Sequence, residues 1–95
     1  MQFVAITTVK PSVVAHPPAD YPLHLEEQAE QMRRALANGE FHQAWLKADR
    51  SGVVVVLEAD SMRAAKALLD EFSLVNAQYA DVQIIGLDPF LKPAL

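Results

Sequence analysis

The sequence predicts an α+β fold in which two helices pack on one face of a four-stranded antiparallel sheet, with the elements in the order βαββαβ. Four segments are rich in β-branched residues or alternate apolar with polar residues, and two others repeat apolar residues at helical spacing. The chain has 95 residues, of which 52% are hydrophobic and 21% charged, so it can form one core but not two. We therefore expect a single domain over residues 1–95, folded as a ferredoxin-like sandwich.

The first predicted strand covers residues 2–9, QFVAITTV, in which β-branched and aromatic residues prevail until Lys10 and Pro11 end it. The following stretch, residues 11–22, contains four prolines and shows little periodicity. We expect a loop there, in extended or polyproline conformation.

The first helix is predicted over residues 23–38, with Asp20 as its cap, Pro22 in its first turn and Gly39 at its end. Apolar positions at spacings of four, three and four form one stripe that should face the core: Leu25, Ala29, Met32 and Leu36. The polar positions on the opposite face are expected to meet water: Glu27, Glu30, Gln31 and Arg34.

A hairpin, a second helix and a last strand complete the predicted order. Residues 41–49, FHQAWLKAD, alternate along a strand, and residues 53–59, VVVVLEA, form its covered partner. Asp49 and Arg50 shape the turn, with Gly52 as its flexible position. Ser61 can cap a helix over residues 62–72, and a connector then leads to a strand over residues 80–87 and an irregular tail. The stripe of this second helix is Met62, Ala65, Leu69 and Phe72.

Alternation through residues 41–49 assigns side chains to the two faces of the sheet. The helix-covered side should carry His42, Ala44, Leu46 and Ala48, with His42 packed against the end of the first helix. The bare side should carry Phe41, Gln43, Trp45, Lys47 and Asp49. An isolated monomer would expose Phe41 and Trp45 together, so we expect a homodimer or larger homo-oligomer that encloses an apolar cavity between two bare faces.

The expected cavity is a small-molecule site whose candidate binding residues come from three strands. The first strand should lie beside the last at the centre of the sheet, which lets their side chains converge with those of the hairpin. The candidates are Thr7, Phe41, Gln43, Trp45 and Gln83. A single large aromatic in a strand also suits plain packing, so Trp45 can serve the core, the cavity or both.

The stretch GEFHQAWLK resembles the muconolactone isomerase family. Members have a long helix, a glycine and a tryptophan six residues later, here Gly39 and Trp45, and then a hairpin and a valine-rich strand. That strand runs into an acidic residue and a serine, here Asp60 and Ser61, and the second helix has a leucine pair. The resemblance implies a dimeric α+β barrel that shifts a double bond in a lactone ring without a cofactor, within aromatic compound metabolism.

Such an isomerisation needs a base near the carbon acid and a donor for the enolate oxygen. The candidate catalytic residues are His24, Lys47 and Tyr79. Histidine is the natural proton shuttle of an isomerase, and His24 should face the sheet from the first helical turn. Lys47 is either an electrophile for an anionic substrate or a solvated residue at the end of a strand. Tyr79 either donates to the enolate or packs at the sheet edge.

Two other functions remain open. The first is a small-ligand binding or carrier protein that keeps the barrel without the chemistry. Two departures from the family favour it: the connector FSLVNAQY lacks the family's prolines, and Lys92-Pro93 stands where the family has His-Pro. The second is a cofactorless oxygenase on a similar barrel, because a fold does not fix a function.

The composition argues against several other classes of protein. The net charge is −4 and the eight Lys and Arg residues are scattered, so we expect no nucleic-acid partner. There is no cysteine, and His16 and His24 lack a third ligand at a defined spacing, so we expect neither a metal nor a cofactor. No signal peptide or membrane-spanning run is apparent, and we expect a soluble cytoplasmic protein with no membrane partner.

Overall fold

The computed structural model describes residues 1–90 and confirms the predicted α+β, ferredoxin-like arrangement. The elements are β1 (Gln2–Val9), α1 (Pro11–Ala15), α2 (Tyr21–Ala37), β2 (Phe41–Leu46), β3 (Gly52–Glu58), α3 (Met62–Asp70), α4 (Ser73–Asn76) and β4 (Ala80–Leu87). They form one antiparallel sheet in the order β2-β3-β1-β4. The first strand therefore lies beside the last, as expected, but β4 is an edge strand and only β1 and β3 are central.

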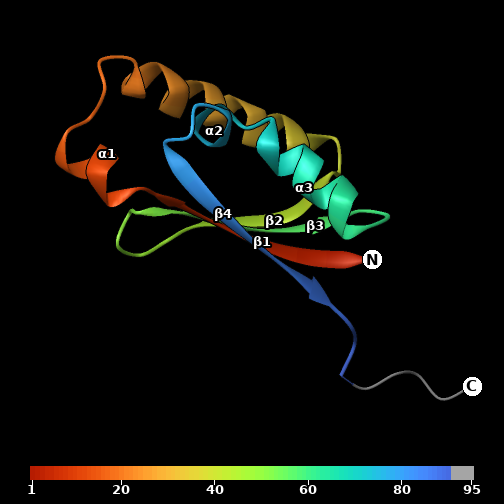
Figure 1. Cartoon of the computed structure of the whole chain (residues 1–95). Coiled ribbons are helices and arrows are strands. Elements are labelled where there is room, and N and C mark those ends of the chain that lie inside the picture. The colour runs from red at the N-terminus through yellow and green to blue at the C-terminus, as the bar shows by residue number, and fades with distance from the viewer. Residues whose placement is uncertain (91–95) are drawn as a thin grey trace, which may run out of the picture.

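The main core lies between the sheet and the helices, which cover one face and leave the other bare (Figure 1). Every second residue of β1 points into this core, which gives the strand its alternating burial. The side chains of Phe3, Val55, Leu57 and Leu69 are completely buried there. The stripe predicted for the second helix lies on α3 and, at Phe72, just after its end. Its burial is confirmed at Ala65, Leu69 and Phe72, whereas Met62 is exposed.

A β-bulge in β2 shifts the alternation by one residue. Phe41 pairs with Leu57 and Gln43 pairs with the next residue, Val56, so His42 is the extra residue of the bulge. Directly paired residues share a face of an antiparallel sheet, which places Phe41 on the helix side with Leu57. His42 is exposed, so its expected packing against the first helix is wrong.

Helix α2 is rotated from its expected orientation. Leu25 and Leu36, from the predicted apolar stripe, are 48% and 40% exposed, whereas Gln28 and Ala35 are buried. A glutamine can occupy the buried face because its side-chain oxygen accepts a 3.0 Å hydrogen bond from the backbone nitrogen of Leu74. The helix therefore turns its Gln28–Ala35 face toward α4 and the sheet, and the apolar stripe lies at the margin.

The two segments expected to be irregular contain short helices. Pro11 starts α1 in the predicted loop, where its fixed φ suits a first helical position. Val13 is buried in a second, smaller core with Val9, Leu74 and Ala80, and this burial explains why the segment folds back on the sheet. Residues 73–76 of the connector form α4.

The hairpin turn is confirmed, but a different residue adopts the left-handed conformation. Arg50 has a φ of 64°, and its backbone nitrogen donates to the carbonyl oxygen of Lys47 at 2.9 Å. Asp49 accepts hydrogen bonds from the backbone and hydroxyl of Ser51. Gly52 serves close packing instead, because a Cβ there would overlap the backbone oxygen of Thr7.

Within residues 1–90, no helix has the length and apolarity needed to cross a membrane. The predicted irregular tail begins after Leu87, and its last five residues, with the Lys92-Pro93 departure, lie outside the described residues.

Candidate functional site

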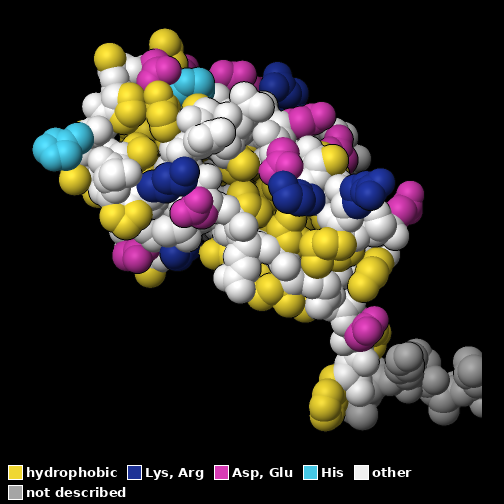
Figure 2. Space-filling view, viewed as in Figure 1, with side chains coloured by type: hydrophobic (Ala, Val, Ile, Leu, Met, Phe, Trp, Pro, Cys, Tyr) yellow, Lys and Arg dark blue, Asp and Glu magenta, His cyan; other side chains and the backbone are white. Residues whose placement is uncertain are grey.

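The bare face of the sheet is largely apolar. Residues that pair across the strands on this face include Val4 with Val56 and Ile85, and Ile6 with Val54. Ile85 is 42% exposed. In the space-filling view, hydrophobic side chains gather along the lower margin of the molecule, where this face comes into sight beneath the sheet (Figure 2).

Four of the predicted site residues lie on this bare face. Trp45 pairs with Val54 and is 49% exposed, and Gln43 pairs with Val56. Gln83, on the opposite edge strand β4, pairs with Ile6 and lies on the same face. Lys47 reaches the same face, since its Nζ donates a 3.3 Å hydrogen bond to the hydroxyl of Thr8. Their placement follows the predicted alternation.

The placement of Phe41 and Thr7 on the bare face is wrong. Phe41 is 1% exposed and packs edge-on against Phe72, with ring centroids 5.4 Å apart. The bulge at His42 accounts for this difference. Thr7 lies on the helix side and is 2% exposed, and its hydroxyl bonds to the backbone of Val53. Its neighbour Thr8 takes the expected position.

His24 and Tyr79 meet in a polar cluster at the start of α2. The imidazole Nδ1 of His24 lies 2.6 Å from the hydroxyl of Ser73, and its Nε2 lies 3.1 Å from Oδ2 of Asp20. The Tyr79 hydroxyl donates a 2.7 Å hydrogen bond to Oδ1 of Asp20, and the rings of His24 and Tyr79 are in edge contact. The Ser73 hydroxyl in turn donates to Glu27 at 3.2 Å.

The electrostatics of the cluster follow from these contacts. The Tyr79 hydrogen bond, followed by the His24 imidazole, lowers the pKa of the Asp20 carboxyl below its ordinary value. The same hydrogen bond raises the pKa of the Tyr79 phenol, so Tyr79 keeps its proton and remains a donor at neutral pH. Asp20 occupies the N-cap position of α2, as predicted, but its side chain makes no capping hydrogen bond.

The three candidate catalytic residues do not converge within one chain. His24 and Tyr79 contact α4 on the helix side, whereas Lys47 contacts Thr8 on the bare face. Sequence reasoning missed Ser73 as a partner of His24, and Glu27 as the acceptor of the Ser73 hydroxyl. The separation of Asp20 and His24 by four residues, with Asp20 just ahead of a helix, was a usable signal for their contact. The contact with Ser73 crosses 49 residues and left no local signal.

Two hollows lie between α2 and the hairpin strands. One is a groove of about 280 Å³ with apolar walls, which include Met32, Leu36, Trp45 and Leu46. Trp45, on an edge strand, thus borders this groove as well as the bare face. The other is smaller, about 70 Å³, and Thr7, Tyr21, Gln28 and Arg50 line it together with apolar residues.

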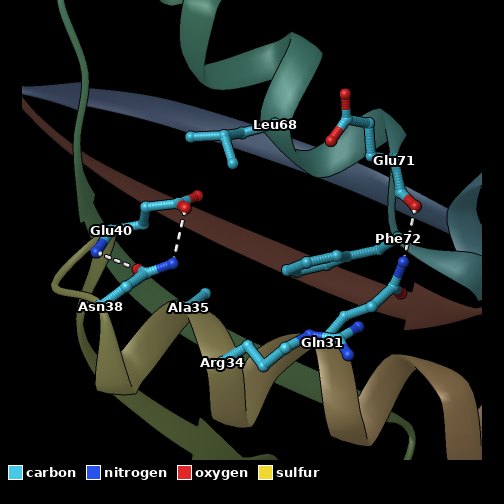
Figure 3. Close-up of a pocket in the computed structure, with 8 residues that line it drawn as sticks. All are labelled: Gln31, Arg34, Ala35, Asn38, Glu40, Leu68, Glu71 and Phe72. Carbon is cyan, nitrogen blue, oxygen red and sulfur yellow. Dashed lines mark hydrogen bonds between the residues drawn. The ribbon is translucent and has the colours of Figure 1, made fainter.

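A third hollow, of about 250 Å³, lies between the ends of α2 and α3 (Figure 3). Phe72 and Leu68 project into it, and Gln31 bridges its side by donating to the backbone oxygen of Glu71 at 3.0 Å. Asn38 and Glu40 bond to each other at its end. Gln31, Asn38 and Glu40 are thus paired, while Arg34 also lines this hollow. Within residues 1–90, no three His, Asp or Glu side chains gather closely enough to hold a metal ion.

Solved structures share this architecture. The chain is similar to a crystal structure of muconolactone isomerase, with 24% identity, a TM-score of 0.76 and coverage of 99% of this chain and 97% of that one. It is also similar to a 5-chloro-2-hydroxyhydroquinone dehydrochlorinase from Burkholderia phenoliruptrix AC1100, in complex with 2,5-dihydroxybenzoquinone. That likeness has 12% identity, a TM-score of 0.60 and coverage of 93% of this chain and 94% of that one. The likeness to an antibiotic biosynthesis monooxygenase has 15% identity, a TM-score of 0.50 and coverage of 94% of this chain and 100% of that one. No curated protein matches the sequence.

The sheet order and these likenesses define an α+β protein with the muconolactone isomerase-like, ferredoxin-like fold. The chain belongs to the family described as Domain of unknown function (DUF3303), whose model matches residues 1–83.

Proposed function

We propose that this chain is a cofactor-independent enzyme that moves a proton between carbons of a lactone or a related small ring compound. The observation that carries the proposal is the placement of His24 between Asp20 and Ser73, in contact with Tyr79. An imidazole fixed on both sides beside a protonated phenol supplies the two groups that such an isomerisation needs. The resemblance in fold to muconolactone isomerase agrees with this chemistry.

The hydrogen bonds support a separate role for each ring nitrogen of His24 in this proposal. The Ser73 hydroxyl donates to Glu27, so its lone pair faces Nδ1 and favours a proton on that nitrogen. The other nitrogen, Nε2, faces the carboxylate of Asp20 and so carries a proton in the resting chain; it becomes the base when a substrate replaces that carboxylate and the Nε2 proton passes to solvent. His24 takes a proton from one carbon, the Tyr79 hydroxyl donates to the enolate oxygen, and His24 returns the proton to another carbon.

Kinetics of single variants test this proposal. We expect His24→Ala to lower the rate of muconolactone isomerisation, followed by absorbance, by roughly 10²–10⁴-fold, the usual contribution of a general base. His16→Ala is the matched control, because His16 is exposed. A His24→Ala rate equal to that of the parent chain would remove His24 from the mechanism.

The bare face belongs to the proposal as the contact with a second copy. Its apolar strands need a cover, and two such faces together would enclose Gln43, Trp45 and Gln83 in an intersubunit cavity. Lys47 lies at one end of this face, on the other side of the sheet from His24 of the same chain, so it supplies its positive charge to a substrate at His24 only if the second copy brings the two together. If Lys47→Ala raises KM and leaves kcat unchanged, the role of Lys47 is to bind the substrate. If the variant lowers kcat alone, Lys47 acts as an electrophile in the reaction.

A second candidate function is non-catalytic binding of a small ligand on the same fold. Both ring nitrogens of His24 already have partners in the described part of the chain, which would suit a structural role. Quenching of the single tryptophan, Trp45, by lactones, quinones or aromatic acids without any turnover would favour binding over catalysis.

A further inference from the structure

Gln28 carries a free hydrogen-bond donor at an enclosed position. Its residue surface is only 5% exposed, and its side-chain oxygen is used by the backbone nitrogen of Leu74. Its amide nitrogen has no partner among the described residues. No completely enclosed side-chain nitrogen or oxygen in residues 1–90 lacks a partner, so this nitrogen keeps some accessible surface. Gln28 is one of the residues that line the small hollow.

The charge around this hollow is positive. Leu25, Leu74 and Val53 form apolar walls, and Arg50 is the one charged residue in the lining. Arg50 makes no ion pair within the described residues, so its guanidinium is available to a ligand. An unpaired amide N–H and an unpaired guanidinium at one hollow are the donors that a carboxylate needs.

The hollow continues into the apolar groove. Leu46 and Val53 line both spaces, and Leu46 is 54% exposed. The hollow of about 70 Å³ suits a carboxyl group, and the groove of about 280 Å³, bordered by Trp45 and Met32, suits a ring.

We propose that each chain binds a small cyclic carboxylic acid between α2 and the hairpin, on the helix side of the sheet. The carboxylate bonds to the Gln28 amide and Arg50, and the ring lies against Trp45 and Met32. This site lies on the opposite face of the sheet from the cavity expected between two bare faces, and Trp45, on the edge strand, borders both. The inference rests on the proposed function for one point only, namely that the bound acid is the substrate.

Binding of benzoate, with benzamide as its neutral isostere, tests the site. The readouts are Trp45 fluorescence and the NMR signal of the Gln28 side-chain amide, which is identified by its loss in Gln28→Glu. That variant keeps an oxygen for the Leu74 nitrogen and replaces the donor with a second oxygen. Arg50→Asn removes the cation and retains a residue that tolerates the left-handed φ of 64°. Arg63→Gln, at an exposed position of α3, is the control for loss of charge.

We expect benzoate to shift the Gln28 amide signal and to bind at least tenfold more tightly than benzamide. Arg50→Asn and Gln28→Glu should each weaken benzoate binding at least tenfold, and Arg63→Gln should leave it unchanged. Benzoate affinity that is unaltered in both site variants, or an unmoved amide signal, overturns the inference. Benzoate binding without any turnover would leave the site standing and remove the enzymatic proposal, whereas turnover without benzoate binding at Gln28 would do the reverse.

Discussion

The hydroxyl of Tyr79 and the carboxylate of Asp20 are joined by a 2.7 Å hydrogen bond that connects the start of β4 to the start of α2. The two residues are 59 positions apart in the chain. The second oxygen of Asp20 contacts His24, so one exposed carboxylate holds both aromatic rings of the polar cluster. The position of His24 therefore depends on a contact between the two halves of the fold.

Removal of this hydroxyl should change the titration of Asp20. The Tyr79 hydrogen bond is the largest cause of the lowered pKa of Asp20, so in Tyr79→Phe we expect that pKa to rise toward its ordinary value of 3.8. Carboxyl ¹³C NMR across an acid titration measures it. Tyr21→Phe is the control, and an Asp20 pKa that is identical in Tyr79→Phe and the parent chain would contradict the hydrogen bond.

Stability should fall in acid. Hydrogen bonds from Tyr79, Arg33, Ser51 and the terminal amine lower the pKa of four carboxyls, those of Asp20, Glu30, Asp49 and Glu58. A folded-state pKa below the unfolded value adds stability that is complete above the unfolded values of 3.8 and 4.5 and is lost as pH falls through the folded values.

Urea denaturation measures the free energy of unfolding at each pH. We expect a constant value above about pH 5.5 and a decline below about pH 4.5, modest because the four carboxyls are exposed. High salt should flatten the decline, since it screens exposed charges. A protein that becomes more stable between pH 5 and pH 3 would refute the assignment.

The strands were predictable because their signal is local. Residues 2–9 and 80–87 coincide with β1 and β4, since β-branched residues and a following proline or turn mark a strand within a few positions. The orientation of α2 was not predictable, because burial of Gln28 depends on a hydrogen bond to Leu74, 46 residues away. The bulge at His42 was also hidden, since alternation carries no mark of an inserted residue.

The candidate site was predictable in part for the same reason. Alternation placed Gln43, Trp45 and Gln83 on the bare face, because that pattern depends only on strand geometry. It could not show that His24 lies on the other side of the sheet from Lys47, because their separation depends on how α2 and α4 pack together.

Phe41 and Trp45 should respond differently to truncation. Phe41→Ala removes a ring that is 1% exposed and should cost about 3–5 kcal/mol of unfolding free energy. Trp45→Ala removes a ring that is 49% exposed and should cost much less, while abolishing the fluorescence response to ligand. Urea denaturation of both variants measures the difference. Equal losses of stability would place Trp45 in the core and undo its assignment to the site.

A charge on the bare face should disrupt pairing with a second copy. Ile85→Lys places a cation on that face at a position 42% exposed, so the isolated chain should tolerate it while the proposed dimer should not. Leu23→Lys, at a position 69% exposed on α2, is the matched control. Sedimentation at micromolar concentration should give a dimer or larger assembly for the parent and the control and a monomer for Ile85→Lys. A monomeric parent chain would exclude the intersubunit cavity.

Two glycines should differ in their tolerance of alanine. At Gly39 the backbone φ is +84° and an added Cβ meets nothing, so Gly39→Ala should cost only the strain of a left-handed residue, about 1–2 kcal/mol. At Gly52 an added Cβ would overlap the backbone oxygen of Thr7, so β1 and β3 must separate locally and the cost should reach about 3 kcal/mol or more. Urea denaturation of both variants measures the two losses of stability. If Gly52→Ala fails to fold while Gly39→Ala folds, the prediction also holds. A smaller loss of stability in Gly52→Ala than in Gly39→Ala would show that the contact between β1 and the hairpin is looser than the structure has it.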